Sequence, residues 1–206
     1  MIHIRRDLAA AACRLPVRPP AGLDDRWRDS AQASGAVDVA YHAFDTPLGR
    51  LLAAVTRVGL VRLAFIDHGE DRVLRELSVA VSPRLVELPS RLASIRRELE
   101  AYGRGRIRAF DVACDWQLIR GFAEPVLRAT GAIAYGEVST YAAIARAAGV
   151  AGAARAAGNA LARNPIPIII PCHRVLRTGG GLGGYAGGLE RKRLLLRLEG
   201  HELELD

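Results

Sequence analysis

The sequence has few cysteines, almost no lysine and no long apolar run. Lys192 is the single lysine among 29 basic residues, and the three cysteines are Cys13, Cys114 and Cys172. An odd number of cysteines without paired spacing argues against a disulfide framework and favours a reducing compartment, so we expect a cytoplasmic protein. No cysteine–histidine cluster has zinc-site spacing, and no stretch approaches the roughly 18 apolar residues of a membrane span. We therefore expect neither a metal centre nor a membrane helix.

The charge balance is basic and rests on arginine. The formal net charge is +7 at pH 7, and half of the residues are hydrophobic. Arginine side chains suit phosphates and base edges, so nucleic acid is one candidate partner. Genome composition or solubility would produce the same charge, and the balance alone does not decide between these explanations. A chain of 206 residues suits one large domain or two small ones.

The composition changes at residue 37. Residues 1–36 are rich in proline, arginine and polar side chains, and we expect a loosely ordered arm there. Beyond them, β-branched and apolar runs bounded by turn residues predict an antiparallel meander. The predicted strands cover residues 37–44, 50–56 and 60–66.

Helical spacing follows the meander. Apolar residues recur with helical period over residues 70–81 and 90–102, with Ser90 as a candidate N-cap. Residues 107–112 are predicted to form one more strand. No reactive group of side chains occurs in residues 37–112, so we interpret this region as a scaffold domain.

Residues 113–206 are predicted to form a mostly helical domain. Helices are expected over residues 121–130, from Ser139 or Thr140 to about 148, over 152–163 and over 189–198. The helices on either side of residues 149–151 are a helix-turn-helix candidate, although most helix pairs only pack. The second of these helices consists mostly of alanine and glycine, and the long side chains of its first half are Arg155 and Asn159. Such a helix could pack tightly inside the protein or approach DNA closely.

A proline-bracketed apolar run leads to the candidate nucleophile. Ile168 to Ile170 predict a short buried strand, followed directly by Cys172 and His173. A thiol next to a titratable base is a candidate for nucleophilic catalysis. The alternative is a cysteine that packs in the core and a histidine that caps. The glycine-rich residues 179–188 that follow could wrap a flat ligand or act as a linker, but they lack the ending of a phosphate loop.

Taken with their neighbours, these residues resemble the O6-alkylguanine-DNA alkyltransferases, also called methylated-DNA–protein-cysteine methyltransferases. The signature is Pro171-Cys172-His173-Arg174-Val175. Further segments in family order and spacing are Tyr135-Gly136-Glu137-Val138, Thr140-Tyr141, Ala153-Ala154-Arg155-Ala156, Asn164-Pro165, Pro167, Tyr185-Ala186-Gly187-Gly188 and Glu199-Gly200. The resemblance implies an α+β fold, in which a small antiparallel-sheet domain of ribonuclease-H-like build precedes a mostly helical domain with a helix-turn-helix.

The resemblance also implies roles for individual residues. Cys172 would accept the alkyl group, His173 would take its proton through a water, Glu199 would hold His173, and Asn164 would brace the turn. The implied DNA contacts are Tyr141, Ala154, Arg155 and Gly158. The implied pocket residues are Tyr141, Pro167, Val175, Gly184, Tyr185 and Ala186. Position 186 is alanine where several relatives have serine, which leaves inhibitor preference open.

The implied reaction is a single, irreversible alkyl transfer from O6-alkylguanine in double-stranded DNA, with O4-alkylthymine as a further candidate substrate. The target base would be flipped out and bound from the minor groove by a monomer without cofactor or metal. The thioether formed on Cys172 has no leaving group, so each chain would react once. Two alternatives are a non-catalytic binder of alkylated bases, whose known forms replace the cysteine, and a cysteine hydrolase or acyltransferase using Cys172, His173 and Glu199.

Overall fold

Alternating side chains build a two-faced sheet in the N-terminal half. The computed structural model describes residues 37–201. Strands β1 (Val39–Thr46), β2 (Gly49–Val55) and β3 (Leu60–Phe65) form the antiparallel meander that the sequence predicts. The hydroxyl of Thr46 stabilises the first turn, since it donates to the Gly49 carbonyl (2.8 Å) and accepts from the Leu48 amide (3.1 Å).

The sheet is mixed, which corrects the prediction of a purely antiparallel one. A fourth strand, β4 (Leu85–Glu87), pairs parallel with β1, and the strand order is β3-β2-β1-β4. Three residues are too few to give a periodic signal, so the sequence did not reveal this strand.

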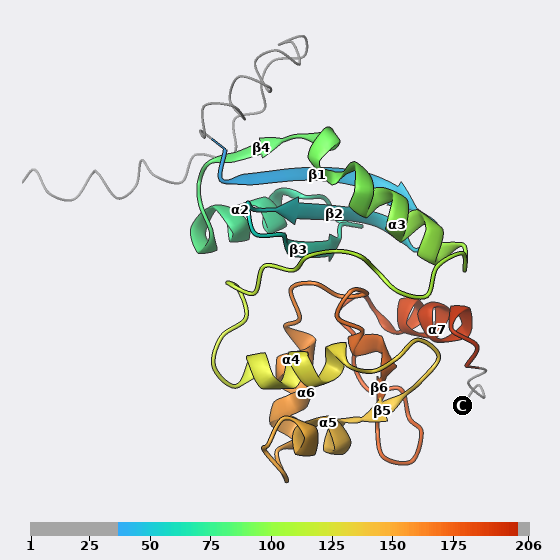
Figure 1. Cartoon of the computed structure of the whole chain (residues 1–206). Helices are drawn as coiled ribbons and strands as arrows, with labels where there is room; N and C mark the ends of the chain where they lie inside the picture. Colours follow the sequence, from blue (N-terminus) through green and yellow to red (C-terminus); the bar gives the residue numbers. More distant parts are fainter. Residues whose placement is uncertain (1–36, 202–206) are drawn as a thin grey trace, which may run out of the picture.

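The strand predicted over residues 107–112 is wrong. This segment crosses from the sheet to the C-terminal layer (Figure 1). The bridge to β3 comes after it, between Cys114 and Leu60, where the Leu60 amide donates to the Ala113 carbonyl (2.8 Å). The apolar side chains of Ile107, Phe110 and Val112 pack against the core. Their pattern therefore reflects packing of a crossing segment and not strand pairing.

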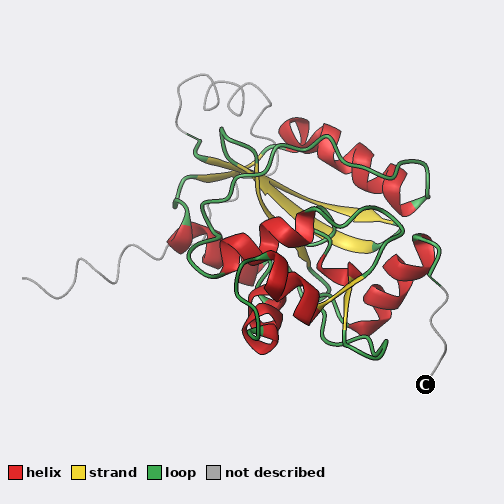
Figure 2. Ribbon diagram, turned by 60° about the horizontal axis from the view of Figure 1, so that its bottom comes forward, coloured by secondary structure: helices red, strands yellow, loops and turns green. Residues whose placement is uncertain are grey.

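Two helices cover opposite faces of the sheet (Figure 2). Helix α2 (Asp71–Ala80) packs on the face that carries Val39 and Tyr41, whereas α3 (Ala93–Gly103) belongs to the cluster that contains Ala40 and Phe44. This division follows the two-residue period of a strand. Ser90 is not the N-cap of α3, because it lies within a short 3-10 turn, η2 (Pro89–Leu92), that precedes the helix.

The C-terminal half is a layer of short helices below the sheet (Figure 1). These helices confirm the predicted ones within a few residues, and Thr140 caps the second by accepting a hydrogen bond from the Ala143 amide (3.1 Å). A parallel pair of two-residue strands, β5 (Ser139–Thr140) and β6 (Val175–Leu176), joins the layer. The helices are α4 (Ala123–Gly131), α5 (Tyr141–Ala147), α6 (Ala154–Ala162) and α7 (Leu189–Leu198).

One apolar cluster runs through both layers. It includes Leu99 and Tyr102 of α3 together with Leu161, Cys172 and Leu195 of the helical half. The helical layer is thereby packed against the α3 side of the sheet, which brings Tyr102 of α3 within reach of His173 and Glu199. Within residues 37–201, no helix is long and apolar enough to cross a bilayer, and the arm predicted over residues 1–36 lies outside the described residues.

Candidate active site

The run before the cysteine forms a tight turn, and the buried strand predicted there is wrong. Ile168 has a positive φ of 75°, and the Ile170 amide donates to the Ile166 carbonyl (2.9 Å). The side chain of Asn164 satisfies the turn from inside: its Oδ1 accepts from the Ile166 amide (3.0 Å), and its Nδ2 donates to the Ile170 carbonyl (2.8 Å). The isoleucines are apolar because the turn is buried, which a short run cannot distinguish from a strand.

Cys172 follows this turn as the first residue of a 3-10 turn, η3 (Cys172–Arg174). Its Sγ is 3.2 Å from Asn164 Nδ2, which donates to it, and 4% of the residue is exposed. Burial raises the pKa of the thiol to about 11, against the opposing effects of the Asn164 hydrogen bond and the Lys192 charge. The resting group is therefore a neutral thiol, which needs a base before it can act as a nucleophile.

His173 and Glu199 form a fully buried pair. His173 Nε2 lies 3.0 Å from Glu199 Oε1, and neither side chain is exposed. Burial lowers the pKa of His173 in spite of the neighbouring carboxylate. Burial tends to raise the pKa of Glu199, but hydrogen bonds from His173 and Arg174 outweigh it and lower the value to about 2. The site thus holds a neutral imidazole against an ionised carboxylate.

This pairing fixes the tautomer of the imidazole. An ionised carboxylate only accepts, so Nε2 carries the proton and Nδ1 carries the lone pair. In the described part of the chain, Nδ1 is buried without a hydrogen-bond partner, and so is the hydroxyl of Tyr185. The tautomer is the one in which Nδ1 can accept a proton.

Arg174, Tyr102 and Lys192 also belong to the site, although the family resemblance implies no role for them. Arg174 donates to both oxygens of Glu199, from Nε and Nη2 at 2.8 Å each. Tyr102 reaches the same carboxylate from α3. Arg174 could have been suspected from its place beside His173, whereas nothing near Tyr102 in the sequence pointed to the site.

Lys192 fastens the glycine-rich loop. It is fully buried, and its Nζ donates to the carbonyls of Val175 (2.6 Å), Leu182 and Gly184 (3.5 Å). Burial lowers the pKa of Lys192 to about 8. The loop is therefore anchored on the first turns of α7, and the signal that could have found this anchor is a lone lysine on the apolar side of a helix.

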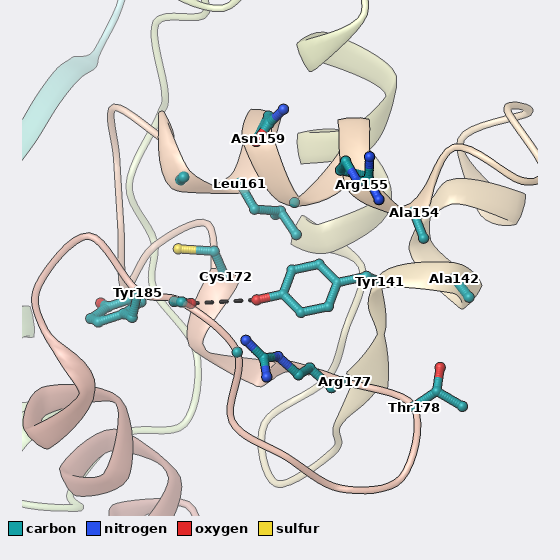
Figure 3. A pocket seen from close by; sticks show the side chains of 14 residues that line it. Tyr141, Ala142, Ala154, Arg155, Asn159, Leu161, Cys172, Arg177, Thr178 and Tyr185 are labelled. Carbon is teal, nitrogen blue, oxygen red and sulfur yellow. Dashed lines mark hydrogen bonds between the residues drawn. The ribbon is translucent and has the colours of Figure 1, made fainter.

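A cavity of about 530 Å³ opens above Cys172, between α5, α6 and the loop (Figure 3). This volume is within the usual range for small-molecule sites, about 300–1,000 Å³. Tyr141 projects across the cavity, and its hydroxyl donates to the Gly184 carbonyl (3.4 Å). Gly183 has a φ of +65°, and a Cβ there would lie 2.5 Å from that hydroxyl, so the loop needs glycine at this position.

The cavity brings together most of the predicted site residues. Besides Cys172, the predicted residues that line it are Tyr141, Ala154, Arg155, Gly158, Gly184 and Tyr185. Pro167 and Ala186 do not line it, since both lie along a second cavity beside β3 and α2. Val175 is fully buried, and its carbonyl accepts from Lys192. The pocket roles of Pro167, Val175 and Ala186 therefore stay predictions.

The described residues contain no group of three or more histidine, cysteine, aspartate or glutamate side chains that could hold a metal ion.

The chain is similar to known methylated-DNA–protein-cysteine methyltransferases. Residues 121–201 match the family model of the 6-O-methylguanine DNA methyltransferase DNA-binding domain. The methylated-DNA–protein-cysteine methyltransferase of Methanosarcina acetivorans is 39% identical over 160 residues, which is 78% of this chain and 97% of that protein. Its counterpart from Mycobacterium tuberculosis is 38% identical over 167 residues, covering 78% and 92%.

Two solved structures from Mycobacterium tuberculosis are similar along most of their length. The crystal structure of its O6-methylguanine methyltransferase has a TM-score of 0.67 at 37% identity and covers 78% of this chain and 92% of that one. A crystal structure described as Mycobacterium tuberculosis OGT in complex with DNA has a TM-score of 0.66, with the same identity and coverage.

Proposed function

Since the chain belongs to the methylated-DNA–protein-cysteine methyltransferase family, we propose that it repairs O6-alkylguanine in duplex DNA by moving the alkyl group irreversibly onto Cys172. The geometry around Cys172 is the observation that supports this residue as the alkyl acceptor. A buried thiol opens on a cavity, and a neutral histidine held by an ionised carboxylate is its neighbour in the same turn.

The proposed first step removes the thiol proton. A thiol with a pKa of about 11 is almost entirely protonated at neutral pH, so a base has to act during the attack. His173 Nδ1 is that base in our proposal, reached through a water. Nδ1 of His173 suits this role, because it is buried without a hydrogen-bond partner in the described region and keeps a free lone pair. Glu199 then stabilises the imidazolium that forms.

The proposed second step is displacement at the alkyl carbon. Sγ forms a bond to that carbon while the carbon–O6 bond breaks, and the electron pair stays on guanine. A donor that meets the developing charge lowers the barrier, and the Tyr141 hydroxyl inside the cavity suits this role. The product is a thioether, from which nothing regenerates the thiol, so each chain reacts once.

We further propose that α5 and α6 act as a helix-turn-helix that approaches the minor groove. Ala154 and Gly158 are small, so the surface of α6 beside the cavity can approach DNA closely. The exposed side chain of Arg155 lies next to them. Chemistry on O6 requires the nucleotide to leave the stack, and an arginine inserted in its place offsets part of that cost. Phosphate contacts would supply most of the affinity and make binding salt-dependent.

The wider assignments are also proposals. We propose that residues 37–112 form a scaffold domain of ribonuclease-H-like build and that residues 113–206 form the DNA-binding and alkyl-acceptor domain. Every residue lining the cavity lies in the second of these regions, which supports the alkyl-acceptor assignment. We also propose that the chain acts as a monomer. The odd cysteine count supports a cytoplasmic location.

The function is tested by incubating the protein with a duplex oligonucleotide containing O6-methylguanine. We expect mass spectrometry to find one added methyl group per chain, on Cys172, with no further turnover of excess substrate. An unmodified protein that stays bound to the lesion would indicate a binder of alkylated bases. Repeated hydrolysis of ester substrates with no adduct would indicate a hydrolase, and either result would contradict the proposal.

The role of Arg155 is tested by Arg155→Ala. If the guanidinium fills the gap left by the flipped base, repair of duplex substrate slows by roughly tenfold or more, because flipping costs a few kcal/mol. Reaction with free O6-benzylguanine, which needs no flipping, stays near the wild-type rate. Arg75→Ala is the matched control, since Arg75 is an exposed arginine on α2, in the other layer and outside the cavity. Equal losses on duplex and free base would make Arg155 a structural residue.

A further inference from the structure

A tyrosine of the N-terminal layer reaches the catalytic pair. Tyr102 lies in the last turn of α3 and is fully buried. Its hydroxyl donates to Oε1 of Glu199, 97 positions along the chain, and lies 3.5 Å from Nε2 of His173. A helix of the sheet layer thereby contributes a polar group to a site otherwise built by the helical layer.

The Glu199 carboxylate is crowded with donors, and Tyr102 shares the oxygen that serves His173. Oε1 accepts from the Tyr102 hydroxyl, His173 Nε2 and Arg174 Nη2. Oε2 accepts from Arg174 Nε and the Gly136 amide (3.3 Å). A carboxylate offers about four lone-pair sites, so each donor changes how strongly the others are held. Loss of the Tyr102 hydroxyl would therefore alter both the position of Oε1 and its attraction for the imidazole proton.

We propose that Tyr102 is a positioning residue for alkyl transfer, which orients Glu199 Oε1 toward His173 Nε2 and limits how strongly that oxygen favours the imidazolium. The proposal rests on the function proposed above, in which His173 has to be neutral to accept the thiol proton. It makes the N-terminal layer part of the reaction rather than a scaffold alone.

The Tyr102 hydroxyl is suited to positioning Glu199 because it stays protonated and can therefore donate a hydrogen bond. Burial, followed by the charge and hydrogen bond of Glu199, raises the pKa of Tyr102 far above its ordinary value of 10.0. The other titratable or charged groups that bear on His173 come from η3, α7 and the loop. They are Glu199, Arg174, Lys192, Tyr185 and, when deprotonated, Cys172. Of these, Glu199 favours the imidazolium, while Arg174 and Lys192 oppose it.

Tyr102→Phe removes the hydroxyl with little change in packing. The ring packs against Phe110, with centroids 4.9 Å apart, and against Tyr135 at 6.1 Å, and phenylalanine keeps both contacts. With one donor fewer, Glu199 attracts the Nε2 proton more strongly, and the pKa of His173 rises. One hydrogen bond of ordinary strength corresponds to a shift of roughly half to one pH unit.

The experiment measures the rate of methyl transfer from duplex DNA between pH 5 and 9, together with the titration of His173 by 15N NMR without DNA. For Tyr102→Phe we expect the acid limb of the rate profile and the His173 midpoint to move up together, so that the rate on the acid limb falls by about three- to tenfold. Tyr135→Phe is the matched control, because its hydroxyl donates to the nearby Leu198 carbonyl (2.8 Å) and not to Glu199. It should leave both curves in place.

A second variant, expected to lower the His173 midpoint, tests the proposal even if Tyr102→Phe does not fold. 3-Fluorotyrosine at position 102 keeps the ring and makes the phenol a stronger donor, so the His173 midpoint should move down. A wild-type profile for Tyr102→Phe, or an equal rate loss at every pH with an unmoved His173 midpoint, would overturn the proposal. The titration needs no substrate, so it stands apart from the proposed function, which fails instead if wild-type protein never acquires a methyl group.

Discussion

Cys172→Ala abolishes alkyl transfer and leaves DNA binding intact. The thiol is the group of the cavity that can form a stable bond to an alkyl carbon, and alanine removes it without adding volume. The turn around it keeps its main support, because the Asn164 amide still donates to the Ile170 carbonyl. We expect a loss of stability of only about 1 kcal/mol, the centre of the range for single substitutions. Binding should be preserved because the arginine and the small residues of α6 are untouched.

Cys114→Ala is the matched control. Cys114 is half-buried, its Sγ donates weakly to the Val112 carbonyl (3.7 Å), and it does not line the cavity. Burial raises the pKa of this thiol as it does that of Cys172, but Cys114 does not share a turn with His173. The variant should accept one methyl group per chain at the wild-type rate. Transfer of methyl groups by Cys172→Ala, measured by mass spectrometry of the intact protein, would show that another residue is the acceptor.

The helices were the most predictable part of the fold. The four helices of the C-terminal layer carry apolar stripes with helical period, and one has a threonine N-cap that the structure confirms at Thr140. The first three strands were predictable for the same reason, since their side chains divide between two buried faces. These signals are local, so a single sequence is sufficient to read them.

The errors occur where tertiary contacts decide the backbone. Strand β4 is three residues long and exists because β1 offers a free edge. The segments around Ile107 and Ile168 are apolar because they are buried, one as a crossing segment and one as a turn held by Asn164. Apolar composition reports burial in each case, and the conformation depends on partners that are distant in the sequence.

The candidate site was likewise predictable only in part from the sequence. The cysteine, the histidine and the residues around them form recognisable motifs, and the cavity brings many of them together. Tyr102 and Lys192 could not be assigned from such motifs, because their roles depend on hydrogen bonds to Glu199 and to three backbone carbonyls. The role of a side chain that acts through another residue can be recognised from its hydrogen bonds in the folded structure.

Glu199→Gln should cause the second-largest loss, through the tautomer of His173. The carboxylate accepts from Nε2, which leaves the Nδ1 lone pair free to act as a base. A glutamine can present its NH₂ group to Nε2 instead, which favours the tautomer with the proton on Nδ1. Loss of the correct tautomer in a carboxylate–histidine pair is severe, and we expect transfer to slow by roughly 100-fold or more. Single-turnover kinetics with methylated duplex would measure it.

The same substitution should also destabilise the protein in a pH-dependent way. Arg174 is buried and makes both of its carboxylate bonds to Glu199, and breaking a buried pair costs about 3–5 kcal/mol. The pKa of Glu199 is about 2 in the folded protein and 4.5 in its ordinary state, so the folded state favours the ionised form. The stabilisation is complete above the higher value and is lost as the pH falls toward the lower one. The difference in unfolding free energy between wild type and variant should therefore shrink between about pH 5 and pH 2.

Glu190→Gln is the control that separates the destabilisation by Glu199→Gln from the mere loss of one negative charge. Glu190 lies in the first turn of α7, and its side chain is 86% exposed in an ion pair with Arg193. Such a pair is worth about 0–1 kcal/mol, so the variant should be nearly as stable as the wild type at every pH and should transfer methyl groups normally. If Glu199→Gln were equally harmless, the buried carboxylate would not be holding the imidazole. The neutral histidine would then need another source of orientation, and Arg174 would need another counter-charge.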